Sequence, residues 1–307
     1  MADVVVLGSL NMDLVVRAER MPRPGETVLG EQFSTVPGGK GANQAAAAAR
    51  LGASVEMIGC VGNDAFGGAL RHNLEAQGVG TARVRTVPGT ATGVAMIILD
   101  AAGENSIVVA PGANAAVTAE DALTARALLR GARYLVMQCE VPIPAVRAAA
   151  AVAADLGLPV ILNAAPAHGI DREALARIPY VIVNEHEAEH VSGIAANSLD
   201  GAGRAARALQ AMGIACPIVT LGPAGALFAE GADLVHVPAR SVHVVDTTAA
   251  GDAFVGGLTV ALLQGRPLAD AVRYATCAGT LATTVLGAQP SLPSAEQVEA
   301  FYRGGSA

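Results

Sequence analysis

The alternation of strand-like and helix-like segments after Gly112 constrains this chain more than any other feature. Alanine-rich segments with a helical period alternate there with short β-branched runs. This order is typical of βαβ units, whose right-handed crossovers place parallel strands in one sheet. We therefore expect an α/β fold with a mainly parallel central sheet and helices on both faces, a Rossmann-like three-layer arrangement. The expected helices are 41–51, 119–129, 145–156, 185–191 and 202–212, and the expected strands are 4–7, 134–137, 160–163, 181–183 and 218–221.

Two β-rich stretches in the first part of the chain do not fit into that sheet. The stretches near 14–37 and 91–112 carry short runs of β-forming residues divided by proline and glycine. We expect them to form short antiparallel strands of a small β lid, with a turn at 101–104. On this interpretation residues 1–307 are one α/β domain, and the lid is formed by two excursions of the chain.

The charge and hydropathy of the chain argue against nucleic-acid and membrane partners. The formal net charge is -7, and the sequence has no basic run of five or more residues. Arg, Asp or Glu interrupts each alanine-rich stretch before it reaches about 18 residues, the length needed to span a bilayer. We therefore expect neither nucleic acid nor membrane as a partner.

The N-terminus and the cysteines indicate the compartment. The chain passes from Met-Ala-Asp directly into an apolar strand, without the basic region or cleavage site of a signal peptide. The four cysteines are widely separated and show no CxxC spacing, so we interpret them as free thiols and not as a zinc site. Both observations predict a cytoplasmic protein.

The segment GGKGAN at residues 38–43 has the composition of a phosphate-binding loop but not its pattern. A Walker A loop would require glycine at Ser34 and Ser or Thr at Gly41, and no G-x-G-x-x-G motif follows the first strand. Both common nucleotide loops are therefore absent. The glycine pair indicates either a close approach of the backbone to another group or a turn that caps the next helix.

A second segment of small residues, Ala-Ala-Gly at 249–251, precedes Asp252. It lies between a strand expected at 242–245 and a helix expected at 253–263. Small residues leave backbone amides accessible at a helix N-terminus, where unpaired donors and the helix dipole favour an anion. Two roles are open for Asp252: a helix cap, or a base that accepts a hydroxyl proton while the amides hold a phosphoryl group.

These two segments, in this order and at this separation, resemble both signatures of the ribokinase-type (pfkB) family of carbohydrate kinases. The first continues as GGKGANQA and reaches Gly52 after six more residues, and the second ends in Ala-Ala-Gly-Asp. The resemblance covers essentially the whole chain and implies an α/β core with a β lid. Further matching segments are GSLNMD at 8–13, PGET at 24–27, NAAP at 163–166, NE at 184–185, TLG at 220–222 and GAQPS at 287–291.

The resemblance implies a sugar site made of polar side chains. A polyol presents donors and acceptors on all sides, and Asp and Glu accept, Lys donates and Asn does both. Taken singly, Asp13 is equally a turn cap and Glu140 a surface charge. The residues implied to bind the sugar are Asn11, Asp13, Gly39, Lys40, Asn43, Glu140 and Asp252.

The resemblance also implies a catalytic centre and a nucleotide site. Asp252 corresponds to the family's base, which takes the proton from the primary hydroxyl of the sugar. The amides of Ala249, Ala250, Gly251 and Asp252 correspond to an anion hole for the transferring phosphoryl group. The implied nucleotide-binding residues are Asn184, Thr220, Gly222, Gly225, Gly251 and Thr276.

The implied cofactors are ATP with Mg²⁺, and K⁺ as a monovalent activator. Glu187 completes the family's N-x-x-E motif at 184–187 and would act on the magnesium indirectly, through water. By itself, Glu187 also fits an exposed charge on a helix. The residues implied to bind the monovalent cation, several through backbone carbonyls, are Asp246, Thr248, Ala282, Val285, Gly287 and Ser291.

The function expected on these grounds is phosphorylation of D-ribose by ATP at the primary 5-hydroxyl, giving ribose 5-phosphate and ADP. The expected assembly is a homodimer that pairs through its lids. One alternative is a kinase for another sugar, such as deoxyribose, fructose, a keto-deoxy acid or a nucleoside. Another is a non-catalytic sugar- or nucleotide-binding protein on the same scaffold. Loss of Asp252 or bulky residues at 249–251 would favour that last reading, and neither is seen.

Overall fold

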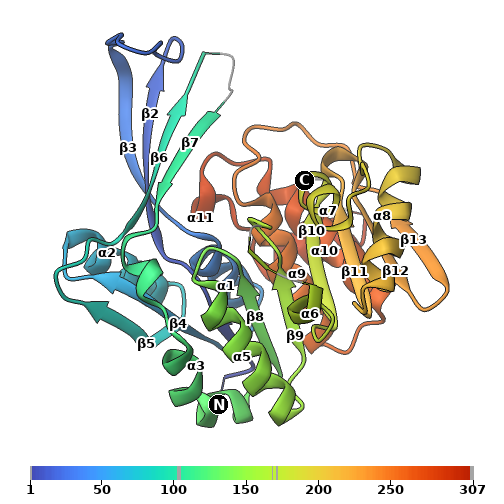
Figure 1. Ribbon diagram of the computed structural model, residues 1–307. Coiled ribbons are helices and arrows are strands. Elements are labelled where there is room, and N and C mark those ends of the chain that lie inside the picture. The colour runs from blue at the N-terminus through green and yellow to red at the C-terminus, as the bar shows by residue number, and fades with distance from the viewer. Residues whose placement is uncertain (1, 102–104, 168, 171, 305–307) are drawn as a thin grey trace.

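The protein is built on two separate sheets, a large one covered by helices and a small one that extends away from it (Figure 1). The computed structural model describes residues 2–101, 105–167, 169–170 and 172–304. Within these residues the alternation of helices and strands produces the expected α/β fold, which is thereby confirmed.

The large sheet has nine strands in the order β13-β12-β11-β10-β9-β8-β1-β4-β5. All neighbours pair in parallel except β11 with β12 and β12 with β13, which are antiparallel. Buried β-branched runs suit parallel strands, because both faces of such a sheet are covered. The strands are β1 (Val4–Leu7), β4 (Val55–Gly62), β5 (Val79–Val87), β8 (Tyr134–Gln138), β9 (Val160–Asn163), β10 (Tyr180–Asn184), β11 (Cys216–Thr220), β12 (Ala226–Glu230) and β13 (Asp233–Val237).

Helices cover both faces of this sheet and enclose two hydrophobic cores. In β1, Val4 and Val6 belong to one core and Val5 and Leu7 to the other, because successive side chains of a strand point to opposite faces. No helix of the described residues is long and apolar enough to cross a membrane. One core takes residues from α1 (Lys40–Arg50), α2 (Ala65–Ala76), α9 (Ala250–Leu263), α10 (Leu268–Ala282) and α12 (Ala295–Tyr302). The other takes residues from α3 (Ala119–Thr124), α4 (Arg126–Gly131), α5 (Ile143–Leu156), α6 (Arg172–Leu175), α7 (Glu185–Ser192) and α8 (Leu199–Ala211).

The small sheet comes from the two β-rich stretches of the sequence, as predicted. Its strands are β2 (Asn11–Ala18), β3 (Gly30–Gly38), β6 (Gly93–Leu99) and β7 (Asn105–Ala110), in the order β3-β2-β6-β7. The central pair, β2 and β6, is parallel, whereas the two outer pairs are antiparallel as expected. The parallel pair arises because both strands leave the large sheet in the same direction. The turn expected at 101–104 lies largely outside the described residues.

Two local expectations differ from the structure. The helix expected at 119–129 is two short helices, α3 and α4, which meet at Ala125. The strand expected at 242–245 is wrong, because this segment has no partner strand and Val244 is 54% exposed. Its β-branched composition favours extended backbone but cannot supply a neighbouring strand. The sequence analysis also left α2, α10 and the strands β4, β5, β12 and β13 unassigned.

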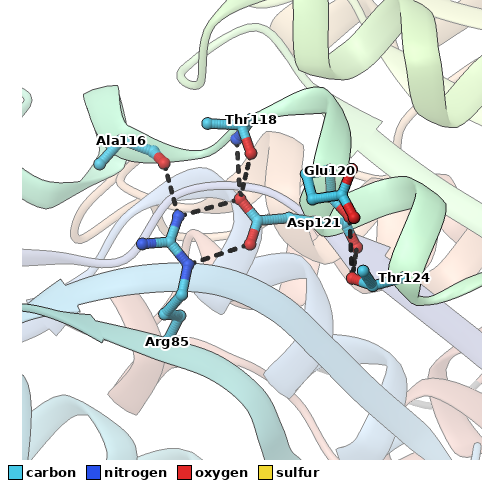
Figure 2. Close-up of polar contacts among 6 residues, drawn as sticks. All are labelled: Arg85, Ala116, Thr118, Glu120, Asp121 and Thr124. Carbon is cyan, nitrogen blue, oxygen red and sulfur yellow. Dashed lines mark hydrogen bonds and ion pairs between the residues drawn. The ribbon is translucent and has the colours of Figure 1, made fainter.

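The chain returns from the small sheet through a short 3₁₀ helix at Gly112–Ala116, and Arg85 fastens this return to the large sheet (Figure 2). Arg85 on β5 donates through Nε and Nη2 to the two carboxylate oxygens of Asp121, each at 3.1 Å. It also donates to the Ala116 carbonyl at 2.7 Å. Asp121 caps α3 by accepting from the Thr118 amide at 2.8 Å. One bidentate ion pair therefore fixes the base of the small sheet to its support.

Candidate active site

Polar residues of the candidate site lie at the carboxyl ends of four neighbouring strands. The strands β10, β9, β8 and β1 adjoin in the large sheet and run in parallel, so their carboxyl ends meet at one edge. Asn11 follows β1, Glu140 follows β8, and Asn163 and Asn184 end β9 and β10. This is the edge at which open α/β sheets bind ligands.

Helices α1 and α9 both begin at this edge and pack closely together. A β-carbon at Gly256 of α9 would come within 2.5 Å of the Ala47 side chain of α1, so only glycine allows this approach. The alanines of α1 serve the same purpose, because their small side chains let a neighbouring helix come near. As a result, the N-terminal end of α1, with Lys40, Asn43 and Gln44, lies beside Asp252 in the first turn of α9.

Asp252 is buried, and each of its carboxylate oxygens accepts one side-chain amide. Asn43 Nδ2 donates to Oδ2 and Gln44 Nε2 donates to Oδ1, both at 2.9 Å. Burial raises the pKa of Asp252, while the charge of Lys40 and the two amides favour the ionised carboxylate and act against that rise. The carboxylate is thus held as a hydrogen-bond acceptor.

Lys40 lies among several acidic groups. Glu140 Oε2 accepts from the Lys40 backbone amide at 3.0 Å and from Ser9 Oγ at 2.6 Å. Burial by itself would lower the pKa of Lys40, but the negative charges of Asp252, Glu140 and Glu187 outweigh it and the pKa is raised. The lysine is therefore a permanent cation that partly balances the surrounding carboxylates.

The carboxyl group of Asp13 is buried beside two other acidic residues. Burial, followed by the negative charges of Glu140 and Asp252, raises the pKa of Asp13 to about 7. A β-carbon at Gly38 would overlap the Asp13 carboxylate. Gly39 has φ +89° and a β-carbon there would lie 2.7 Å from the Asn11 amide nitrogen. The glycine pair therefore permits the close approach of the backbone to another group that was one of the two interpretations of the GGKGAN segment.

The orientation of the Asn11 amide is set by Asn114. Asn114 Nδ2 donates to Asn11 Oδ1 at 2.7 Å, and Asn114 Oδ1 accepts from the Leu10 backbone amide at 2.9 Å. A β-carbon at Gly93 would overlap both carboxamides. Because Oδ1 of Asn11 is engaged in this way, its Nδ2 group is the donor left for a ligand.

The N-terminus of α9 has free donors and a strained residue. Ala249 has φ +59°, the left-handed conformation that a residue with a β-carbon rarely adopts. Such strain concentrates at functional sites. The Ala250 amide donates to the Thr247 carbonyl at 3.2 Å. The amides of Gly251 and Asp252 have no acceptor among the described residues, and a β-carbon at Gly251 would meet open space.

A cavity of about 570 Å³ opens beside this helix end. Its lining combines hydroxyl groups and glycines with the apolar side chains Val242 and Phe254, which suits a ligand with a flat apolar part. Gly225 has φ +94°, and a β-carbon there would overlap the Val237 carbonyl, so glycine is required. Of the residues expected to bind nucleotide, the cavity lining includes Thr220, Gly222, Gly225, Gly251 and Thr276.

Asn184 does not line the cavity and instead pairs with Glu187. The Glu187 amide donates to Asn184 Oδ1 at 2.9 Å, and the Asn184 amide donates to Glu187 Oε2 at 2.8 Å. This reciprocal capping box begins α7. Burial raises the pKa of Glu187, while the Asn184 amide and the charge of Lys40 act against that rise. Glu187 is therefore within electrostatic reach of the lysine.

Asp246 joins the two loops in which the expected cation ligands lie. Its Oδ1 accepts from the Thr248 amide at 2.9 Å and from Thr248 Oγ1 at 2.7 Å, and its Oδ2 accepts from the Gly287 amide at 2.8 Å. Burial would raise the pKa of Asp246, but these hydrogen bonds and the charge of Arg17 outweigh it and lower the pKa. The lining of a second cavity, of about 490 Å³ between the small sheet and the core, includes Asp13, Asp246, Thr248 and Gly287.

The other expected cation ligands, Ala282, Val285 and Ser291, do not line that cavity. Ser291 Oγ donates to the Ala288 carbonyl at 2.7 Å. The carbonyls of Thr248 and Val285 accept no hydrogen bond from the part of the chain that is described, so both remain free to ligate a cation. That same part holds no group of three or more His, Cys, Asp or Glu side chains that could bind a metal ion.

Comparison with known proteins decides the family. Residues 1–295 match the pattern of the pfkB family carbohydrate kinases. The chain belongs to this family. This pfkB kinase is 41% identical to the ribokinase of Bacillus subtilis over 299 residues. The matched region covers 97% of this chain and 99% of the relative. The chain is 37% identical over 300 residues to the deoxyribokinase of Salmonella typhi, with 97% and 98% covered. Its structure is similar to that of Arabidopsis thaliana ribokinase complexed with ribose and ATP, with a TM-score of 0.89, 31% identity, and 98% of this chain and 99% of that chain covered.

This pfkB kinase also has polar residues at the site that the sequence analysis did not single out. Gln44 contacts Asp252, Ser9 contacts Glu140, and Asn114 contacts Asn11. Gln44 and Ser9 lie inside segments that the sequence analysis quoted, and this position was the available signal. Asn114 carried no such signal, because it lies 103 residues from its partner. Further residues that line the larger cavity are Arg240, Ser241, Thr247, Gly279, Thr280 and Thr283.

Proposed function

We propose that this pfkB kinase transfers the γ-phosphoryl group of ATP to the primary 5-hydroxyl of D-ribose, giving ribose 5-phosphate and ADP. One observation carries the proposal. Asp252 is a buried, hydrogen-bonded carboxylate at a helix N-terminus with free amides, between a polar cluster and a nucleotide-sized cavity. A base and an anion hole in this arrangement suit phosphoryl transfer to a hydroxyl group.

The polar cluster provides the partners that a sugar requires. Asn43 Oδ1 is buried and has no donor among the described residues, so it is an acceptor awaiting a hydroxyl group. Asn11 offers its Nδ2 donor, because Asn114 occupies its oxygen. Lys40 supplies a cation, and Asp13 and Glu140 supply carboxylate acceptors. We infer that these five side chains and the Gly39 backbone bind ribose and aim its 5-hydroxyl at Asp252.

The reaction then follows from the residues around the helix N-terminus. The hydroxyl oxygen attacks the γ-phosphorus while its proton passes to Asp252, and the bond from the γ-phosphorus to the bridging oxygen breaks to release ADP. Of the amides from Ala249 to Asp252, those of Gly251 and Asp252 have no acceptor among the described residues, and we expect this group of amides to stabilise the charge that develops on the phosphoryl oxygens. The adenosine part of ATP occupies the cavity lined by Thr220, Gly225 and Thr276. Asn184 is assigned to the nucleotide site by resemblance only.

The cations fit this site in different ways. When bound, Mg²⁺ neutralises phosphate charge, and Glu187 would hold it through water, which agrees with the hydration that Mg²⁺ retains in proteins. K⁺ would be held by Asp246, Gly287 and the carbonyls of Thr248, Ala282 and Val285, with Ser291 nearby. A large monovalent ion prefers such uncharged oxygen ligands around a single carboxylate. These residues would then fix the loop that precedes the anion hole.

The small sheet is proposed to act as a lid and as a dimer interface. Its inner face lines the cavity that holds Asp13, so movement of this sheet covers or opens the sugar site. Its other face exposes Phe33, Met96 and Val108, an apolar surface that a second copy of the chain would cover. We propose a homodimer through the lids, to be checked by analytical ultracentrifugation. A reducing compartment such as the cytoplasm suits the four free cysteines.

The first experiment is ADP release with Mg²⁺-ATP and K⁺ across a panel of sugars that includes D-ribose and 2-deoxyribose. We expect ribose to be the best substrate, and Asp252→Asn to lower kcat by about 10³-fold or more. Asp155→Asn, on an exposed position, is the matched control and should keep full activity. Better turnover of deoxyribose would keep the mechanism and change the substrate. A folded protein that binds ATP but turns over no sugar would contradict the proposal.

A further inference from the structure

Four buried carboxamides form one continuous network behind the carboxylate of Asp252. Asn43 and Gln44 contact Asp252 directly, and Gln138 and Asn163 contact Gln44. All four are at most 8% exposed. The proposed sugar site uses Asn43, whereas Gln44, Gln138 and Asn163 have no role in the reaction as described above.

Gln44 is held in a single orientation by three hydrogen bonds. Its Nε2 group donates to Asp252 Oδ1 at 2.9 Å and to Asn163 Oδ1 at 3.1 Å. Its Oε1 accepts from Gln138 Nε2 at 2.7 Å. Asn163 is fixed in turn, because its Nδ2 donates to the Ile182 carbonyl at 3.3 Å. A rotated Gln44 amide would bring its oxygen against two acceptor oxygens, so only the observed orientation is compatible with an ionised Asp252.

Gln138 extends this directionality to the end of β8. Its Nε2 donates to Gln44, while its Oε1 is buried and has no donor among the described residues. That oxygen lies against Gly8, where a β-carbon would overlap it. Rotation of the Gln138 amide would set two oxygens, Oε1 of Gln138 and Oε1 of Gln44, against each other. Gln138 therefore keeps the orientation in which Nε2 donates to Gln44, although this leaves its Oε1 unpaired. Gly8 provides the space for that oxygen.

We propose that Gln44 and Gln138 form a positioning relay that fixes the rotation of the Asp252 carboxylate and holds it as a proton acceptor toward the sugar hydroxyl. The relay deepens the proposed function and rests on Asp252 being the base. Hydrogen bonds run in one direction, from Gln138 to Gln44 to Asp252. Asn43 donates to the other oxygen of Asp252, so each carboxylate oxygen accepts one side-chain amide. Rotation of the carboxylate would therefore break a hydrogen bond.

Charged groups from several elements also act on Asp252, and the relay must be separated from them. Lys40 on α1 favours the ionised carboxylate. Glu140 after β8, Asp13 on β2 and Glu187 on α7 oppose it. Lys40 contributes charge but no hydrogen bond to Asp252 in the structure, whereas Gln44 contributes a directed donor. Removal of Gln44 thus leaves the charges in place and removes one of the two donors to the ionised form.

The test is the pH dependence of kcat at saturating ribose and ATP. Loss of a hydrogen-bond donor to a carboxylate raises the pKa of that carboxylate, and a base must be ionised to work. As the pH is lowered, the variants should therefore lose activity at a higher pH than the natural protein does. We expect the acid limb of Gln44→Met to rise by about 1 to 2 pH units. Gln138→Met should shift it in the same direction by less than about 1 unit, because Gln44 then only gains freedom to rotate. Gln44→Glu keeps the shape and also raises the limb, because two adjacent carboxyl groups cannot both ionise easily.

Two further measurements make the result decisive. Gln77→Met removes a half-buried glutamine just after the end of α2, and it should leave the acid limb unchanged. The Asp252 carboxyl ¹³C shift, assigned by its loss in Asp252→Asn, reports the pKa without turnover and should move with the kinetic limb. Unchanged limbs in folded Gln44→Met and Gln44→Glu would reduce Gln44 to a packing residue and overturn the relay. A shifted ¹³C titration with an unchanged kinetic limb would support the relay and overturn Asp252 as the base.

Discussion

The proposed active site has two sides that use different chemistry, a sugar side around the Asp252 side chain and a nucleotide side at the cavity beside α9. On the sugar side, charged and amide side chains are buried and paired with one another, as Asp252 is with Asn43 and Gln44. On the nucleotide side, the groups available to a phosphate are backbone amides beside glycines, and a β-carbon at Gly251 would meet open space. Selection among sugars requires directed side chains, whereas a phosphate group is bound well by amides that every residue carries.

This difference has a consequence for mutation. A side chain on the sugar side is part of a network, so its loss disturbs neighbours and changes both stability and pKa values. Gly251 has open space where a side chain would project, so its replacement should affect ligand binding and leave the fold intact. The contrast can be tested at one residue on each side and at the loop between them.

The largest effect is expected for Gly251→Val. The added side chain projects into the space beside the free amides and blocks the phosphoryl group, so kcat/KM for ATP should fall by about 10²-fold or more. KM for ribose and the melting temperature should change little. The measurement is steady-state kinetics with a thermal melt, and Gly68→Val, at an equally open position on α2, is the control. A large loss of stability would show that the nucleotide side is as tightly coupled as the sugar side.

A smaller effect on activity is expected for Asp13→Asn, and this substitution should increase the stability of the fold at high pH. The folded pKa of Asp13 is about 7, above the value of 3.8 for a free group, so the folded state binds more protons between these values and loses stability as pH rises through them. The asparagine variant should be stabilised near pH 8, by up to about 4 kcal/mol, and much less near pH 4. It should also raise KM for ribose by about 10-fold or more, because a carboxylate acceptor is lost.

Thermal melts across pH and ribose kinetics check this second prediction, with Asp155→Asn as the control. Equal melting temperatures for the natural protein and Asp13→Asn at high pH would mean that the ionised Asp13 carboxylate does not destabilise the fold. In that case the contrast between the two sides would be weaker than the geometry indicates.

The smallest effect is expected at the loop that links the two sides. Rates in K⁺ should exceed those in tetramethylammonium, at equal ionic strength, by on the order of tenfold, because the cation orders the loop before the anion hole. Asp246→Ala should abolish this difference while it leaves ATP binding measurable. Equal rates of the natural protein in the two salts would count against a cation site at Asp246.

The sequence predicted the fold well wherever one segment carried its own signal. The buried β-branched run of β1 and the alanine-rich α1 were both recognisable from local pattern. The segment 242–245 has the same composition as a strand but lacks a partner, and pairing is a property of distant residues. Helix α2 was left unassigned because adjacent glycines, Gly67 and Gly68, weaken its helical pattern.

The site was predictable to the same extent. Asp252 and Lys40 lie in motifs that could be read directly, and the structure brings them together. The orienting residues could not be read in this way. Gln138 and Asn114 act across 94 and 103 residues, and their role depends on which way an amide faces. A linear pattern contains no information on that orientation, which only packing and hydrogen-bond geometry determine.

Asn11 and Asp13 lie at the start of β2, and Lys40 comes just after the end of β3, so these residues, which we propose bind the sugar, lie at the root of the small sheet. A flap moves far at its tip and hardly at all at its pivot. If the small sheet acts as the proposed lid, its opening would admit and release sugar without separating the groups proposed to recognise it. The turn between β2 and β3 lies far from these residues, so we expect changes in its length to leave the proposed sugar site unchanged.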